Sequence, residues 1–203
     1  QLQQVACHLL SLHRYRPAKS NLEKLIGRCI LTKQWSTARI AIEALGKIGD
    51  AETTVLLMSL AGADADRFVD HSLRYALYEL DQTETISKYL SDSNPDRRKL
   101  ALSTLDLLQA KEILTADVLT SAASDAAVAD VAMDLLAKRP ELADEVLSKL
   151  RKQWQDGFAD ASPSALFEKL AYSWRDQPAW QKFIAETIPV ATSDMGWQWK
   201  ELL

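Results

Sequence analysis

The stretch RYALYEL, at residues 74–80, recurs in altered form at two later places in the chain: LSTLDLL at 102–108 and DVAMDLL at 130–136. A fourth version, IEALGKI at 42–48, precedes them. Each version has the apolar spacing of an α-helix rather than the alternation of a strand. One helical phrase is therefore repeated along the chain.

The period of the repeat indicates how such helices are arranged. Aligning Leu45, Leu77, Leu105 and Met133 gives spacings of 32, 28 and 28 residues. A helical phrase at this period is typical of stacked helix pairs, in which each unit buries its apolar face against its neighbours. We therefore predict an all-α protein built from repeated antiparallel helix pairs.

Almost all of the remaining sequence also has helical spacing, interrupted by only six glycines and six prolines. The expected helix starts have capping residues at Ser36, Asp66, Asn94 and Asp125, and Asn94 is followed by proline at the first helical position. The expected helices are 1–13, 21–33, 36–48, 51–61, 67–80, 83–90, 97–108, 115–123, 126–139, 141–154, 163–174 and 178–188, with 189–203 as a tail or short last helix.

The helical phases predict which side chains are buried. Small residues are expected at the seam between units, and Val55, Leu56 and Leu60 are expected to point inward. The seam residues are Ala44, Ala76, Thr104 and Ala132. Five of the six tryptophans lie in the last 50 residues, where large aromatic side chains can close the end of a stack. We predict repeats over 1–155 and a capping unit over 156–203.

Composition excludes several classes of protein. The fractions of hydrophobic (47%) and charged (26%) residues are those of an ordinary soluble globular protein. A net charge of -4 argues against nucleic acid as a partner, since phosphate binding needs a surplus of cations. The chain contains no run of about 18 apolar residues, which a membrane-spanning helix would need.

Two further predictions concern the state of the two cysteines and the origin of the chain. Cys7 and Cys29 lie in apolar helical patterns and are expected as buried free thiols, with a disulfide between the first two helices as the alternative. The chain begins at Gln1 rather than Met. We interpret it as a piece of a longer protein or a processed form.

Two segments carry a resemblance to a known family. ARIAIEALGKIGD at 38–50 and NPDRRKLA at 94–101 resemble HEAT repeats, which are related to armadillo repeats. The resemblance covers roughly residues 36–155. It implies a right-handed α-α superhelix that acts as a protein-binding scaffold. The sequence departs from the HEAT pattern at the position of Gly46. In the three later repeats, the equivalent residues are Tyr78, Asp106 and Asp134.

DRFVDHSLRYAL at 66–77 carries a second resemblance. It is similar to the HEAT section of large bacterial proteins that join a sugar-dehydrogenase-like propeller to a c-type cytochrome. This resemblance implies an accessory or spacer domain and a location in the periplasm or cell envelope. Without it, a cytoplasmic location is expected. Cys7-His8 does not complete a haem signature, because Gln4 stands where a cysteine is needed.

No catalytic or metal-binding signature is present. The chain lacks HExxH, CxxC, G-x-S-x-G and a glycine-rich phosphate loop. His8 and His13 are five residues apart and fall on different faces of one helix, and His71 lies far away in sequence. We therefore expect no enzyme, no cofactor and no small-molecule substrate.

The repeated helices predict a binding strip instead. With the seam residues buried, a basic and aromatic set points outward, and arginine and tyrosine are frequent at binding hot spots. The set is Arg39, His71, Arg74, Tyr75, Tyr78 and Lys99. The alternative is that these side chains are only solvated or paired with nearby carboxylates. Trp180, Trp197 and Trp199 present a similar choice between a ligand platform and a packed cap.

The sequence predicts a non-catalytic interaction or spacer module. Its partner is expected to be a protein or a neighbouring domain of the same polypeptide. The first alternative is an accessory domain of a haem-linked oxidoreductase. A second alternative, a HEAT-like DNA-repair glycosylase, is disfavoured by the acidic charge balance.

Overall fold

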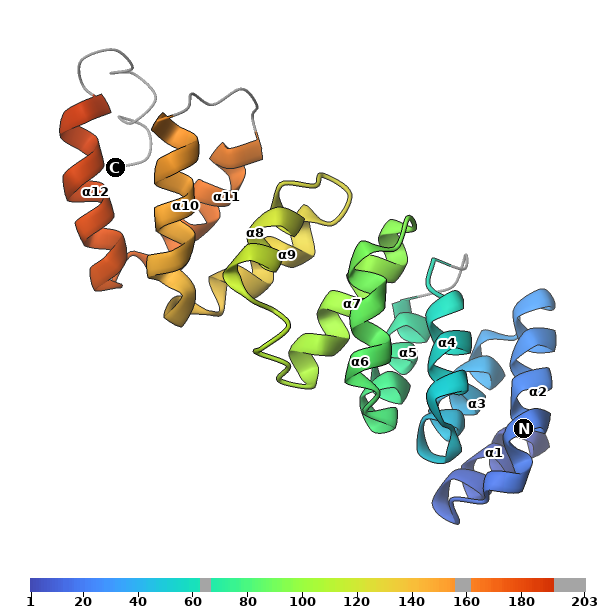
Figure 1. Ribbon diagram of the computed structural model, residues 1–203. Coiled ribbons are helices and arrows are strands. Elements are labelled where there is room, and N and C mark those ends of the chain that lie inside the picture. Colours follow the sequence, from blue (N-terminus) through green and yellow to red (C-terminus); the bar gives the residue numbers. More distant parts are fainter. Residues whose placement is uncertain (63–66, 156–161, 192–203) are drawn as a thin grey trace. The chain divides into compact units, whose positions relative to one another are not determined.

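The chain is all-helical. The computed structural model describes residues 1–62, 67–155 and 162–191, and these hold twelve α-helices and no strand (Figure 1). They divide into two units, Gln1–Ile113 and Leu114–Leu203, which are described separately. The first holds α1 (Leu2–Leu12), α2 (Lys19–Leu31), α3 (Trp35–Ile48), α4 (Ala51–Ser59), α5 (Arg67–Leu80), α6 (Thr83–Ser87) and α7 (Pro95–Leu107). The second holds α8 (Ala116–Ala123), α9 (Ala129–Ala137), α10 (Ala143–Gln155), α11 (Ser162–Trp174) and α12 (Pro178–Ala191).

In the first unit, alternate helices pack against one another. The helices α1, α3, α5 and α7 pack in this order, each against the next, while α4 packs on α5, α6 and α7, and α6 packs on α7. The aligned residues Leu45, Leu77 and Leu105 are fully buried between these helices, whereas Met133 of the second unit is half-buried. The repeated phrase therefore marks core-facing helices, as predicted.

The helices α3 and α5 run in the same direction and in register. The Ser72 hydroxyl donates a hydrogen bond to the Glu43 carboxylate at 2.7 Å, and Gly46 lies directly against Ala76. Each contact joins residues 29 or 30 positions apart, so the two helices stay aligned along their length. All four predicted seam residues, Ala44, Ala76, Thr104 and Ala132, are completely buried.

The approach of α3 to α5 depends on a missing side chain. A Cβ on Gly46 would lie 2.5 Å from the Cα of Ala76 and 2.9 Å from its carbonyl oxygen. Because these are backbone atoms, the two helices would have to separate to accommodate it. Glycine at this position therefore sets the distance between α3 and α5.

One predicted helix cap is confirmed, and α4 has a cap that was not predicted. Asn94 caps α7, its side-chain oxygen accepting from the Asp96 amide at 2.8 Å. Asp50 caps α4, with Thr53 completing a capping box. Asp66 lies outside the described residues.

Two other cap predictions are wrong. The helix α3 begins at Trp35, so Ser36 lies inside it, and the Ser36 hydroxyl accepts instead from Gln4 of α1. Asp125 accepts from the Ala127 amide within a turn, and α9 begins only at Ala129.

Three further expectations meet different outcomes. Val55 is half exposed rather than inward, because α4 buries Leu57 and Met58. The helix α12 extends to Ala191, three residues beyond the expected end at Ile188. Cys7 and Cys29 are buried free thiols, as predicted. Burial raises the pKa of both thiols, and the charge of an ionised Cys29 adds to the effect on Cys7.

The second unit also joins helices by contacts between positions a similar distance apart. Lys149 of α10 pairs with Asp117 of α8, and Lys169 of α11 pairs with Asp134 of α9. The Trp174 indole nitrogen, on a fully buried side chain, donates to the Ala137 carbonyl at 3.3 Å. These contacts join α8 to α10 and α9 to α11, while α8 also packs on α9 and α10 on α12.

Candidate functional site

The helix α5 exposes an aromatic face. At 100° per residue, Phe68, His71, Tyr75 and Tyr78 fall within an arc of about 80°, and we call these four residues the α5 face. All four are solvent-exposed, with Phe68 at 46% and Tyr78 at 47%. The opposite side of α5 is buried through Leu73, Ala76 and Leu77. The amphipathic pattern of α5 thus places aromatic rings, rather than charges, on its outer side.

Arg39 extends the α5 face onto α3. Its guanidinium lies 4.9 Å from the centroid of the Phe68 ring, within cation–π range. The Arg39 Nε is buried without a hydrogen-bond partner in the described part of the chain. The guanidinium therefore lies against an aromatic ring, and no ion pair joins it to a carboxylate among the residues that the structure describes.

Two of the predicted residues on α5 have polar contacts within their own helix. The Arg74 Nε donates to the Asp70 carbonyl at 3.4 Å. The pKa of Tyr75 is raised above its ordinary value, chiefly because its hydroxyl is hydrogen bonded to Glu79, with burial adding to the effect. Arg14, which follows α1, approaches Glu79 to 3.9 Å. The C-terminal end of the α5 face therefore carries a charged border.

The structure brings most of the predicted strip together. His71, Arg74, Tyr75 and Tyr78 lie on α5, and Arg39 reaches them through Phe68. Lys99 is half-buried on α7, the next helix in the packing order, where its carbonyl accepts from the Ser103 hydroxyl. The sequence prediction missed Phe68, although its position three residues before His71 and seven before Tyr75 carries the signal.

The C-terminal aromatic residues present no platform in the described part of the chain. Trp180 is only 5% exposed and its ring lies 4.8 Å from that of Phe167 and 5.9 Å from that of Phe183. Trp180 is thus packed, as the cap interpretation expects. Trp197 and Trp199 lie outside the described residues.

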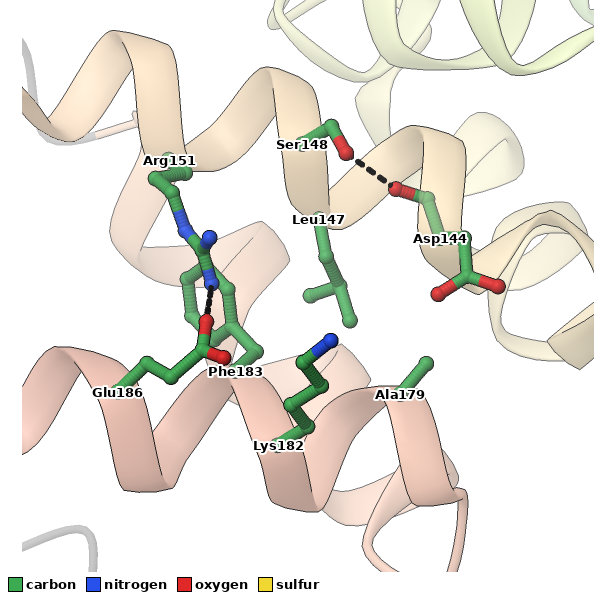
Figure 2. Close-up of a pocket in the computed structure, with 8 residues that line it drawn as sticks. All are labelled: Asp144, Leu147, Ser148, Arg151, Ala179, Lys182, Phe183 and Glu186. Atoms are coloured by element: carbon green, nitrogen blue, oxygen red, sulfur yellow. Dashed lines mark hydrogen bonds and ion pairs between the residues drawn. The ribbon is translucent and has the colours of Figure 1, made fainter.

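A small cleft lies between α10 and α12 (Figure 2). It has a volume of about 120 Å³. Figure 2 shows Arg151 reaching from α10 across the Phe183 ring to pair with Glu186 of α12. The cleft is lined by Asp144, Leu147, Ser148, Arg151, Ala179, Lys182, Phe183 and Glu186.

The cleft residues offer no arrangement for nucleophilic catalysis. The Ser148 hydroxyl donates to the Asp144 carbonyl, a bond within its own helix, and no histidine lines the cleft. Two basic and two acidic side chains balance in charge. The sequence reasoning did not anticipate this cleft, because its two sides are about 35 residues apart and carry no recognisable motif.

Two other properties of the described residues bear on function. They contain no cluster of three or more His, Cys, Asp or Glu side chains that could hold a metal ion. In the same part of the chain, none of the helices has the length and apolar character needed to cross a membrane.

Comparison with known proteins gives no relative from which a role could be transferred: no family model, no curated protein and no solved structure matches the chain.

Proposed function

We propose that this chain is a HEAT-like solenoid module that binds a protein partner through the α5 face and Arg39. The in-register contacts between α3 and α5 support the repeat architecture. Stacked helix pairs of this kind place equivalent helices side by side. The contacting pairs Glu43–Ser72 and Gly46–Ala76 are 29 and 30 residues apart, between the sequence spacings of 28 and 32.

The observation that carries the proposal is the cluster of exposed rings beside an arginine that lacks a carboxylate partner in its described surroundings. Tyrosine and arginine are enriched at binding hot spots, where large flat side chains bury much area with little loss of conformational entropy. Phe68, Tyr75 and Tyr78 are each at least 36% exposed. A helix that served only as support would be expected to present charged residues there.

The partner is expected to cover the rings and supply a carboxylate to Arg39. A guanidinium stacked on a ring can still donate hydrogen bonds along its edge, and a carboxylate accepts two of them in parallel. The proposed module has no chemical activity of its own and acts by holding its partner, which is another protein or another domain of the same polypeptide.

Cross-linking mass spectrometry of the tagged chain in a native extract tests the proposal. The wild type is compared with a Tyr75→Ala/Tyr78→Ala variant and with Tyr172→Ala, which removes a 79% exposed tyrosine of α11. We expect one set of cross-linked partners to be lost only in the first variant. If no partner depends on Tyr75 and Tyr78, the proposed role of the α5 face is wrong.

A further inference from the structure

Two pairs of opposite charges line the cleft between α10 and α12, and the two pairs differ. Arg151 and Glu186 form an ion pair, with the guanidinium 5.5 Å from the centroid of the Phe183 ring. Asp144 of α10 and Lys182 of α12 are both exposed, and neither side chain has an ion pair or a hydrogen bond among the residues that the structure describes. The cleft therefore has one neutralised pair of charges and one pair that is open to a ligand.

The two open charges reach into the same space (Figure 2). The Asp144 carboxylate extends from α10 toward Ala179, whereas the Lys182 side chain extends from α12 and its ammonium ends beside Leu147. Each charge is therefore directed toward the opposite helix. Since the two charges do not pair with each other, a ligand that lies between them can contact both.

The base of the cleft is apolar. Leu147 is 4% exposed and Phe183 is 2% exposed, and the half-buried Ala179 lies beside them. The volume of about 120 Å³ gives room for about 8 to 12 water-sized groups, at about 10–15 Å³ for each. The cleft therefore fits a compact molecule of about ten non-hydrogen atoms, one part of which is apolar.

We propose that this cleft binds a small zwitterion, namely a free α-amino acid with an aliphatic side chain. The carboxylate of the ligand pairs with the Lys182 ammonium, its ammonium pairs with the Asp144 carboxylate, and its side chain packs on Leu147 and Phe183. A ligand with a single charge would be attracted by one open charge and repelled by the other, so charge complementarity selects a zwitterion. The cleft lies in the second unit, and the proposal does not rest on the α5 face.

Titration of the purified full chain with L-leucine, followed by the amide shifts in ¹H–¹⁵N NMR spectra, tests the binding. We expect saturable shifts in α10 and α12 with a dissociation constant of about 1 mM, since a ligand of this size gains little free energy at an exposed site. Two matched ligands test the need for both charges. 4-Methylpentanoate lacks the ammonium and 3-methylbutylamine lacks the carboxylate, and each should bind at least about threefold more weakly than leucine.

Variants of the two open charges test the assignment of each contact. Lys182→Met should remove the preference for leucine over 3-methylbutylamine, because the ligand carboxylate then has no partner. Asp144→Asn should remove the preference for leucine over 4-methylpentanoate. The matched control is Lys152→Met, at an exposed lysine of α10 that does not line the cleft, and it should leave both preferences unchanged. Circular dichroism checks that each variant remains helical.

Three results would each overturn the proposal. The first is the absence of saturable shifts with leucine up to about 50 mM, far above the expected dissociation constant. The second is equal binding of the three ligands. The third is a pair of preferences that persists in Lys182→Met and Asp144→Asn. None of these results bears on a protein partner of the α5 face, so the two proposals fail separately.

Discussion

Two surfaces in the same series of packed helices differ. The seam between α3 and α5 is closed, because each helix covers the other, whereas the outer side of α1 is open to solvent. The closed seam has a glycine against a backbone and a serine bonded to a glutamate. The open side has four aliphatic side chains and no charged group. In the closed seam, the close approach and the polar bond set the distance and register of the two helices, whereas the open side presents only aliphatic side chains, without such contacts among the described residues.

The largest expected effect is on the closed seam. Replacing Gly46 with alanine places a Cβ 2.5 Å from the Ala76 Cα, and overpacking against backbone costs about 1–3 kcal/mol. We expect the free energy of unfolding of the first unit to fall by about 2 kcal/mol, measured by urea titration with circular dichroism.

Gly27→Ala provides the matched control within α2. No atom lies within 4 Å of the Cβ that it adds, so the substitution should raise stability by about 0.5–1 kcal/mol through helix propensity alone. If both alanine variants shift the unfolding midpoint in the same direction, the close approach of α3 to α5 is wrong.

The polar bond of the closed seam is expected to have the second largest effect. Ser72 is fully buried and donates to Glu43 at 2.7 Å. Ser72→Ala leaves a half-buried carboxylate without its donor, at a cost of about 1–2 kcal/mol. A double-mutant cycle with Glu43→Ala, which removes the acceptor, measures the coupling. Additive effects of the two substitutions would show that the bond contributes nothing.

A smaller effect of opposite sign is expected where α7 ends. Gln109 has φ = +56°, in the left-handed region that glycine adopts without strain. Gln109→Gly should raise the free energy of unfolding by about 0.5–1 kcal/mol, in the same titration. Gln109→Ala is the control, since it removes the side-chain bond to the Asp106 carbonyl but keeps a Cβ. An equal gain in both variants would contradict the backbone explanation.

The smallest expected effect concerns Tyr75, on the outer side of α5. Its pKa is raised in the folded state, first by the bond to Glu79. A raised pKa means that folding favours the neutral phenol, so this contribution is present below the unfolded pKa and is lost as the pH rises through the folded value. Glu79→Gln should lower the pKa of one tyrosine, measured by phenolate absorbance. The same titration in Tyr75→Phe should lack that component.

Much of the first unit could be predicted from sequence because its apolar period is regular. Leu45, Leu77 and Leu105 recur at one helical position, and all three are buried. The prediction for Val55 failed because VLLM at 55–58 is apolar throughout and has no readable phase. The capping box of Asp50 and Thr53 sets where α4 begins, and α4 turns Leu57 and Met58 inward.

The cap predictions at Ser36 and Asp125 failed for different reasons, a contact between helices in the first case and a local turn in the second. The Ser36 hydroxyl is engaged by Gln4 of another helix, which no local pattern reveals. Asp125 bonds to the amide two residues later, the geometry of an Asx turn, and the chain turns before α9 begins.

The candidate site was predicted in part. The outward direction of His71, Tyr75 and Tyr78 follows from the phase of one helix, and sequence is sufficient for that. The contact of Arg39 with Phe68 joins two helices 29 residues apart, and it depends on their distance and register. Those are set by Gly46 and the bond between Ser72 and Glu43, which become visible only in three dimensions.

The separation of several bonded positions has a kinetic consequence. Side-chain hydrogen bonds between α1 and α3 and between α3 and α5 link residues 29 to 33 apart, and those from α8 to α10 and from α9 to α11 link residues 32 and 37 apart. Closing a chain segment of this length costs nearly the same entropy at every step, and contacts of short sequence separation favour fast folding. During synthesis, each helix could therefore dock as soon as the next thirty or so residues leave the ribosome.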